Sequence, residues 1–336
     1  MNQELINKWA ALAARNPQKV AFPEATEEKI LLAARQAADT KAIIPILVGG
    51  ADEIRAAAEG FGVDISDMTV MENSQEALQA AGEAYSAINP LFSQKAVCRR
   101  GKDPMAYAFI LQALGQVDGV FAGLVHTTGD VILAAQTYVG LKEGVTTASS
   151  IGILDIPGYE GSEGNLLAFG DSAVCIDPNE EELADIAISA CETVSELLGW
   201  GPRCALMSFS TNGSAEHARA QKVRDAVAIA NKKRPDLAID GEFQLDAAIS
   251  PAVASKKVGR ESKVAGKANI VIFPDLSAGN IGVKLMQQFA HADAYGPLLQ
   301  GFRKPVSDCS RSAPVSELVG NIIMLAVRAG RAKEQV

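Results

Sequence analysis

The sequence contains no run of about 18 uninterrupted apolar residues, which a membrane-spanning helix needs. Its first residues, Met-Asn-Gln-Glu-Leu, lack the basic segment and apolar stretch of a secretory signal. Lysine and arginine form no long run and the formal net charge is −9, whereas a nucleic-acid-binding protein needs a basic face. We therefore expect a cytoplasmic protein that binds neither a membrane nor nucleic acid.

Residues and motifs that define several common sites are also scarce. The five cysteines form no C-x-x-C pair, and an odd number fits a reducing compartment better than a disulfide framework. The three histidines, His126, His217 and His291, lack the spacing of metal ligands, so we expect surface or packing roles for them. No G-x-G-x-x-G, Walker lysine or G-x-S-x-G motif occurs. These absences argue against a structural zinc site, a P-loop and a hydrolase nucleophile.

What the sequence does contain is the alternation typical of α/β proteins. Short apolar runs alternate with amphipathic helical stretches from end to end, which predicts α/β folding with mostly parallel sheets. We expect strands at residues 19–22, 43–48, 119–122, 205–209, 270–273 and 297–299. We expect helices at residues 28–38, 104–114, 180–198, 222–233 and 283–289, with a first helix around Trp9 and a last one from near Pro314, whose apolar spacing predicts one buried face.

The length of 336 residues and the 48% hydrophobic content predict two domains. We expect a first α/β domain from residues 1–144 with 299–336, and a second from residues 145–298, the two facing a cleft. We expect residues 142–144 and 158–165 to form loops near the point where the chain passes from one domain to the other.

Four buried strands are each followed by Gly, Ser, Thr, Asn or Asp. These polar segments are Gly123 to Asp130, Ser208 to Ser214, Pro274 to Asn280 and the loop before the last helix. In open α/β sheets, ligands bind outside the carboxyl ends of the strands. The four segments therefore predict one shared binding cleft.

The loop before the last helix is the most informative of the four. It presents Ser310 as a donor, Arg311 as a clamp for phosphate or carbonyl oxygen, and Glu317 as a base at a helix entrance that attracts anions. The helix dipole should lower the pKa of Glu317 and keep it ionised. Alternatively, Glu317 is simply an acid favoured in a first turn, and Arg311 pairs with Asp308. Cys309 reads as a packing residue.

Two other loops have both a binding and a structural interpretation. Gly279, Asn280 and Gly282 suit close backbone approach to a phosphate or pantetheine group, or form an ordinary strand-to-helix turn. Ser210 and Asn212 belong to a similar loop, which either binds substrate or caps a helix before Ala215.

Long blocks of the chain resemble the phosphotransacetylase (phosphate acetyltransferase) family, including the short form of ethanolamine utilisation. The blocks are LMSFSTNGSA from Leu206, DGEFQLDAA from Asp240, VAGKANIVIFPDLSAGNIG from Val264, and YGPLLQG from Tyr295, continuing to Ser310-Arg311. The N-terminal half agrees more loosely, through Phe22-Pro-Glu24 and the VDGVFAGLVHTTGD block from Val117. The resemblance thus spans essentially the whole chain.

The resemblance implies two α/β domains like those of isocitrate and isopropylmalate dehydrogenases, in a homodimer. It implies reversible acyl transfer between coenzyme A and inorganic phosphate, through acyl phosphate, in a ternary complex without a cofactor or metal. By position, Ser310 and Arg311 match the pair that steadies the reacting groups, Glu317 stands where the family has the Asp that deprotonates the thiol, and Arg99 looks like an arginine that holds phosphate. The substrate-binding residues would also include Ser210, Asn212, Gly279, Asn280, Gly282 and Tyr295.

The chain departs from the family pattern at three places. Leu133 stands where the family usually has an arginine, so either Arg100, Lys102 or Arg303 replaces that cation or the affinity for phosphate falls. Ala313 replaces a family cysteine, and Glu317 is one methylene longer than the family's Asp. A longer base moves the position from which it takes a proton.

Three functions follow in order of preference. The first is an active phosphate acyltransferase, with acetyl as the leading acyl group and propanoyl next. The second is a degenerate module that binds acetyl-CoA and acts in regulation or oligomerisation, which the change at Leu133 favours. The third, a decarboxylating dehydrogenase, lacks the aspartate cluster that would hold its metal. The sequence leaves acyl-chain length, direction in the cell and microcompartment targeting open.

Overall fold

The computed structural model describes residues 3–334, and the side chains of residues 3–331. The chain forms two compact units, named here for their place in the sequence. The terminal unit comprises Gln3–Gly140 and the segment from Phe302 onward, and the middle unit comprises Leu141–Gly301. The chain passes from one unit to the other at residues 140–141 and 301–302. The boundaries expected from the sequence lie at residues 144–145 and 298–299.

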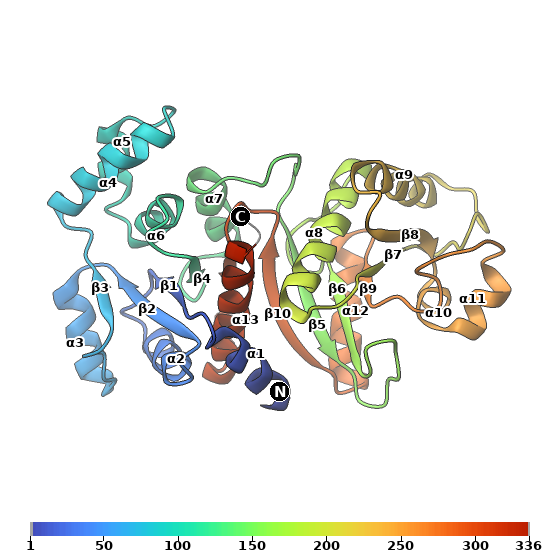
Figure 1. The fold of residues 1–336 in the computed structure, drawn as a ribbon, viewed down its shortest axis with the longest axis horizontal. Coiled ribbons are helices and arrows are strands. Elements are labelled where there is room, and N and C mark those ends of the chain that lie inside the picture. Colours follow the sequence, from blue (N-terminus) through green and yellow to red (C-terminus); the bar gives the residue numbers. More distant parts are fainter. Residues whose placement is uncertain (1–2, 335–336) are drawn as a thin grey trace. The chain divides into compact units, whose positions relative to one another are not determined.

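The terminal unit is built on a parallel sheet with the order β3-β2-β1-β4-β11, of which Figure 1 labels the first four strands. Every neighbouring pair in this series is parallel. Its strands are β1 (Gln18–Phe22), β2 (Ile43–Val48), β3 (Thr69–Met71), β4 (Gly119–Ala122) and β11 (Val306–Asp308). Because the strands are parallel, the loops after β1, β4 and β11 emerge at one edge of the sheet.

Two groups of helices pack on this sheet. In the first group, α13 contacts α1 and α2 and lies against β1, β4 and β11; in the second, α6 and α7 pack together. The helices are α1 (Gln3–Ala13), α2 (Glu28–Asp39), α3 (Ala51–Phe61), α4 (Gln75–Ile88), α5 (Gln94–Arg100), α6 (Pro104–Ala113), α7 (Thr128–Tyr138) and α13 (Val315–Glu334).

The last helix is more deeply buried than its sequence pattern predicts. The pattern indicates one buried face, but every residue from 320 to 329 of α13 is buried. The expectation of a single buried face is therefore wrong, because α1 and α2 cover the side of α13 that the sheet leaves uncovered.

The middle unit contains a mixed sheet with the order β10-β5-β6-β9-β7-β8. The β10–β5 and β5–β6 pairs are antiparallel and the remaining pairs are parallel. Its strands are β5 (Ser149–Asp155), β6 (Leu166–Gly170), β7 (Arg203–Met207), β8 (Ala238–Phe243), β9 (Ile270–Ile272) and β10 (Asp293–Gln300). Its helices are α8 (Glu180–Leu198), α9 (Ala218–Lys233), α10 (Leu245–Ile249), α11 (Pro251–Lys257) and α12 (Leu276–Phe289).

The two α/β units, with mostly parallel strands, confirm the predicted fold class. The helix α12 starts seven residues earlier than predicted because Asp275 caps it, accepting a hydrogen bond from the Ala278 N–H at 2.9 Å. Gly279, Asn280 and Gly282 therefore lie inside the helix, and the interpretation of these residues as a turn before it is wrong. Within residues 3–334, no helix has the length and apolar character needed to cross a membrane.

Candidate active site

The carboxyl edge of the terminal sheet gathers polar residues from three neighbouring strands. Glu24 follows β1, His126 follows β4, and Asp308 ends β11. β4 pairs with both β1 and β11, so these residues come from adjacent strands. The sequence predicted polar residues after β4 and in the loop before the last helix, but gave no role to Glu24.

Glu24 organises this edge through a buried carboxylate that is 4% exposed. It accepts hydrogen bonds from the backbone N–H groups of Leu124, Val125 and His126 at 2.8, 2.9 and 3.0 Å. Its Oε1 also lies 2.9 Å from the Nδ1 of His126. Burial alone would raise the pKa of Glu24, but the hydrogen bonds from His126 and its neighbours outweigh burial and lower it. Glu24 therefore remains ionised and fixes both the loop after β4 and the His126 ring.

Asp308 directly precedes the loop that carries Ser310 and Arg311, and its pKa is shifted in the opposite direction from that of Glu24. Burial, and then the nearby charge of Glu24, raise its pKa to about 6, although a hydrogen bond donated by Thr128 Oγ1 opposes this shift. Gly123 has φ +109°, and a Cβ there would lie 2.0 Å from Asp308 Oδ1. The loop after β4 can therefore pack against Asp308 only with glycine at this position.

The Ser310-Arg311 loop itself is exposed but held at its base. Lys29 of α2 donates hydrogen bonds to the backbone carbonyls of Arg311 and Ala313, at 3.4 and 3.1 Å. The Oγ atoms of Ser310 and Ser312 lie 3.0 Å apart, and the Ala313 N–H closes the turn by donating to the Ser310 carbonyl at 3.0 Å. These contacts fix the backbone and leave the side chains of Ser310 and Arg311 exposed.

The alternative in which Arg311 pairs with Asp308 is wrong. Arg311 forms no ion pair with any side chain of residues 3–331, because Asp308 is buried against Thr128. The pKa of Asp130 is lowered mainly by hydrogen bonds from Thr127, and to a smaller extent by the nearby His126 and Arg311. The side chains of His126 and Arg311 therefore lie around the same part of the edge.

Glu317 lies in the first turn of α13 and is half-buried. Burial raises its pKa above the usual value. The expectation that the helix dipole lowers this pKa is wrong, because desolvation of the carboxylate dominates at this position. A raised pKa makes Glu317 a stronger base than an exposed glutamate.

Cys309 is a packing residue, as the sequence suggested. It is 4% exposed, and burial raises the pKa of its thiol, an effect to which Glu24, Asp308 and then Glu317 add. The thiol therefore stays protonated at neutral pH, which does not suit a nucleophile.

The middle unit brings two further polar loops to one edge of its sheet. β7 and β9 are parallel neighbours, so the Ser208 to Ser214 segment and the start of α12 emerge together. Ser210 is fully buried and donates to Glu242 Oε1 at 2.7 Å, while Asn212 is exposed and accepts from Arg260 Nε at 3.1 Å. Helix capping before Ala215 is wrong, because α9 begins later with His217 as its N-cap.

The other predicted binding residues of the middle unit differ in exposure. Gly279 is buried, and a Cβ there would lie 2.2 Å from the Asp171 carbonyl oxygen, so close packing explains this glycine. A Cβ at Gly282 would lie 3.2 Å from the Phe273 ring. Asn280 is exposed, whereas Tyr295 is 1% exposed in β10 opposite Ile153.

The cations discussed for phosphate binding are dispersed. Leu133, at the position of the expected arginine, is 64% exposed on α7. The Arg303 guanidinium lies beside Gly140, just beyond the end of α7, and Arg100 lies over the Phe92 ring with its Cζ 5.4 Å from the centroid. Arg99 and Lys102 line a pocket formed by α4 and α5. Within residues 3–331, no group of three or more His, Cys, Asp or Glu side chains forms a metal-binding cluster.

Comparison with known sequences identifies the family. Residues 4–326 match the family described as phosphate acetyl/butaryl transferase. The chain belongs to this family. Phosphate acetyltransferase of Clostridium acetobutylicum is 38% identical over 335 residues, covering 98% of this chain and 99% of that protein. The corresponding enzyme of Thermoanaerobacterium thermosaccharolyticum is 39% identical over 328 residues, covering 97% and 98%.

Solved structures support this assignment. EutD phosphotransacetylase from Staphylococcus aureus matches with a TM-score of 0.86 at 32% identity, covering 97% of this chain and 98% of that one. A phosphotransacetylase from Streptococcus pyogenes matches with a TM-score of 0.89 at 32% identity, covering 98% and 99%. A 4-hydroxythreonine-4-phosphate dehydrogenase from Klebsiella pneumoniae matches with a TM-score of 0.55 at 10% identity, covering 94% and 100%, and so shares the fold alone.

Proposed function

We propose that this protein is a phosphate acyltransferase that reversibly transfers an acyl group between coenzyme A and inorganic phosphate, with acetyl as the leading group and propanoyl next. Full-length similarity to phosphate acetyltransferases carries this proposal. The exposed Ser310-Arg311 pair on a braced loop supports it. The degenerate module and the dehydrogenase are not favoured, because the relatives are named phosphate acetyltransferases and the dehydrogenase likeness is limited to the fold.

In the proposed reaction, Glu317 takes the proton from the coenzyme A thiol as the thiolate attacks the acyl carbon. Arg311 offsets the charge that develops on the carbonyl and phosphate oxygens, and Ser310 donates a hydrogen bond to the same group. The C–O bond to phosphate then breaks, and phosphate leaves with the electron pair. The raised pKa of Glu317 suits it to accept this proton. We propose that the step needs no cofactor, which full activity in a metal chelator would test.

The remaining predicted residues are proposed to bind the substrates. Among those of the middle unit, Asn212 and Asn280 are exposed and can contact coenzyme A through their side chains. Ser210, Gly279 and Tyr295 are buried and would act by shaping the backbone around it, as would the half-buried Gly282. In this proposal the middle unit binds coenzyme A. Arg99 of the terminal unit is proposed to hold phosphate.

Acyl phosphate formation from acetyl-, propanoyl- and butanoyl-CoA with added phosphate tests the proposal. We expect turnover with at least acetyl-CoA, and a loss of 100-fold or more in kcat/KM for Arg311→Ala, since the clamp acts on developing charge (roughly 3 kcal/mol). Arg15→Ala is the matched control, because Arg15 is an exposed arginine of the same unit. Absence of turnover despite coenzyme A binding would support the degenerate module instead.

Leu133→Arg tests the family departure on α7. We expect a lower KM for phosphate, because the side chain at this exposed position would add a cation on α7, the helix that follows the loop after β4. An unchanged KM for phosphate would show that this protein holds phosphate through other groups.

We also propose that the protein is a cytoplasmic homodimer. Only Gly279 of α12 is buried, whereas Ile281, Leu285 and Phe289 are 58%, 49% and 81% exposed. These three side chains recur every four residues and form an apolar stripe that a second copy would cover. Sedimentation of Leu285→Glu should show monomers where the wild type forms dimers. The five cysteines are free, in keeping with a reducing compartment.

A further inference from the structure

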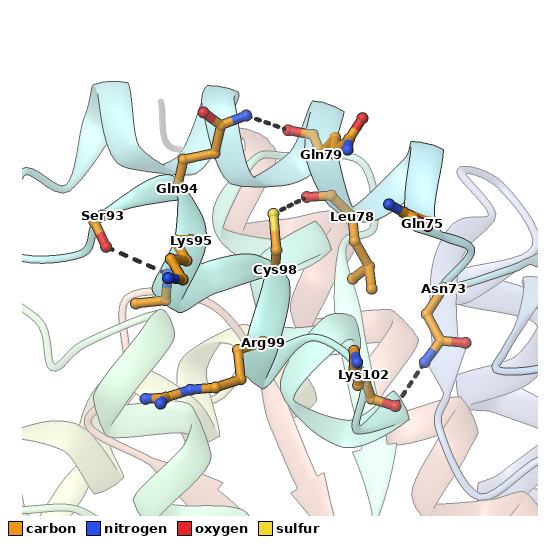
Figure 2. Close-up of a pocket in the computed structure, with 11 residues that line it drawn as sticks. Asn73, Gln75, Leu78, Gln79, Ser93, Gln94, Lys95, Cys98, Arg99 and Lys102 are labelled. Atoms are coloured by element: carbon orange, nitrogen blue, oxygen red, sulfur yellow. Dashed lines mark hydrogen bonds between the residues drawn. The ribbon is translucent and has the colours of Figure 1, made fainter.

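The terminal unit contains a pocket of about 1010 Å³ that the proposed transfer does not use apart from Arg99. One wall comes from Asn73 and α4, and the other from α5 and the turn that follows it (Figure 2). We call this the α4–α5 pocket. It shares no lining residue with the Ser310-Arg311 loop or with the Glu24 edge.

The walls of the α4–α5 pocket are fixed by close packing. A Cβ at Gly82 would lie 2.9 Å from the Cys98 sulfur, and a Cβ at Gly101 would lie 2.6 Å from Leu78 Cδ2. Figure 2 shows the hydrogen bonds that join the walls: Cys98 Sγ donates to the Leu78 carbonyl at 3.1 Å, and Asn73 donates to the Lys102 carbonyl at 2.8 Å. The pocket is therefore formed before any ligand binds, which lowers the entropic cost of binding.

All the charged side chains that line the pocket are cationic, and they lie on the wall formed by α5 and the turn that follows it. Lys95, Arg99 and Lys102 are spaced four and three residues apart, so they lie along one side of α5 and its following turn. None of the three forms an ion pair with a side chain of residues 3–331, and the pocket lining contains no Asp or Glu. This is an unusual concentration in a chain with a net charge of −9. Three uncompensated cations favour a ligand with several negative charges.

The opposite wall is rich in side-chain amides. Gln75 and Gln79 lie one turn apart on α4, and neither side-chain amide bonds to a described residue. An amide offers both a donor and an acceptor, which is the combination that the edge of a nucleobase requires. Leu78 between them adds an apolar surface for a ring. The volume lies at the upper end of small-ligand sites and exceeds what phosphate alone would fill.

The structure assigns the α4–α5 pocket to a nucleotide that carries two or more phosphates, with the phosphates against Lys95, Arg99 and Lys102 and the base against the amide wall. This site goes beyond the proposed acyl transfer. The nucleotide is either a free nucleoside di- or triphosphate or the nucleotide end of a second coenzyme A molecule, separate from the one that the middle unit is proposed to bind, and both have this chemistry.

Isothermal titration calorimetry at low salt, with ATP, ADP, coenzyme A and inorganic phosphate, tests the site. We expect ATP or ADP to bind at least tenfold more tightly than phosphate, and Lys95→Gln and Lys102→Gln each to weaken binding about fivefold to tenfold. Arg100→Gln is the matched control: it removes the same charge next to Arg99 but from a side chain that lies over Phe92. It should change affinity less than twofold. If coenzyme A and ATP compete for the pocket, the bound nucleotide is the nucleotide end of coenzyme A. If they do not compete, it is a free nucleotide.

Two results would overturn the assignment. One is no binding of ATP, ADP or coenzyme A that depends on Lys95 or Lys102. The other is a nucleotide affinity that is lost in Arg311→Ala but unchanged in both lysine variants. The nucleotide would then occupy the reaction site. Since Arg311→Ala should lower kcat/KM for acyl transfer 100-fold or more yet preserve nucleotide binding in the α4–α5 pocket, failure of this inference and failure of the proposed function are distinguishable.

Discussion

Glu24→Gln tests how the carboxyl edge of the terminal sheet is organised. The Glu24 carboxylate accepts three backbone N–H hydrogen bonds and contacts the Nδ1 of His126. A glutamine retains one oxygen but replaces the other with an NH₂ group, which would face an N–H donor in the loop after β4. Hydrogen bonds to a charged acceptor contribute about 1.5–3 kcal/mol each, and a buried donor left unsatisfied adds to the loss. We expect a destabilisation of about 2–4 kcal/mol.

The effect depends on pH in a defined direction. The folded-state pKa of Glu24 lies below its ordinary value of 4.5, so its carboxylate contributes stability above that pH. This contribution is lost as the pH falls through the lower folded-state pKa. The stability difference between wild type and Glu24→Gln should therefore be largest at neutral pH and shrink below about pH 4.5.

Hydrogen–deuterium exchange of the segment 123–128, together with thermal unfolding, measures the local and global effects. A local readout is needed because two compact units need not unfold as a single two-state transition. Glu28→Gln is the control, since Glu28 is an exposed glutamate at the start of α2 and should change stability by less than about 0.5 kcal/mol. Unchanged protection of the Leu124, Val125 and His126 amides in Glu24→Gln would refute the reasoning.

Four further predictions follow from the structure. Between pH 7 and 5, wild type should gain about 1 kcal/mol of stability relative to Asp308→Asn in urea titrations, because the Asp308 pKa is raised to about 6; a parallel pH dependence of the two proteins would contradict this. Lys29→Met should lower kcat about tenfold by releasing the Ser310-Arg311 loop, with Lys29→Arg retaining most activity in the same assay. The acid limb of the kcat/KM profile should lie above pH 4.5 and disappear in Glu317→Gln, and a limb that persists would assign it to another group. Gly279→Ala should destabilise the protein by about 1–3 kcal/mol in thermal unfolding, because the new methyl group would overlap a carbonyl oxygen; a neutral effect would disprove the packing argument.

The sequence predicted those elements whose signals are local. The apolar runs of β2 and β4 and the long amphipathic α8 occur as expected, because periodicity and length specify such elements without tertiary information. Short strands such as β3 and β11 were missed, because three residues give no period that distinguishes a strand from a loop. The start of α12 was misplaced because its Asp275 cap precedes a glycine-rich stretch that resembles a turn.

The sequence by itself determined the family, the α/β class and the Ser310-Arg311 loop, because these depend on residue order and local pattern. Only the tertiary structure decided how that loop is supported. Lys29 and Glu24 lie more than 280 residues before the loop, and they reach its surroundings because parallel β1, β4 and β11 end at the same edge. The tertiary structure also reversed the pKa shift expected for Glu317. A helix dipole can be inferred from sequence, but desolvation depends on what packs around the side chain.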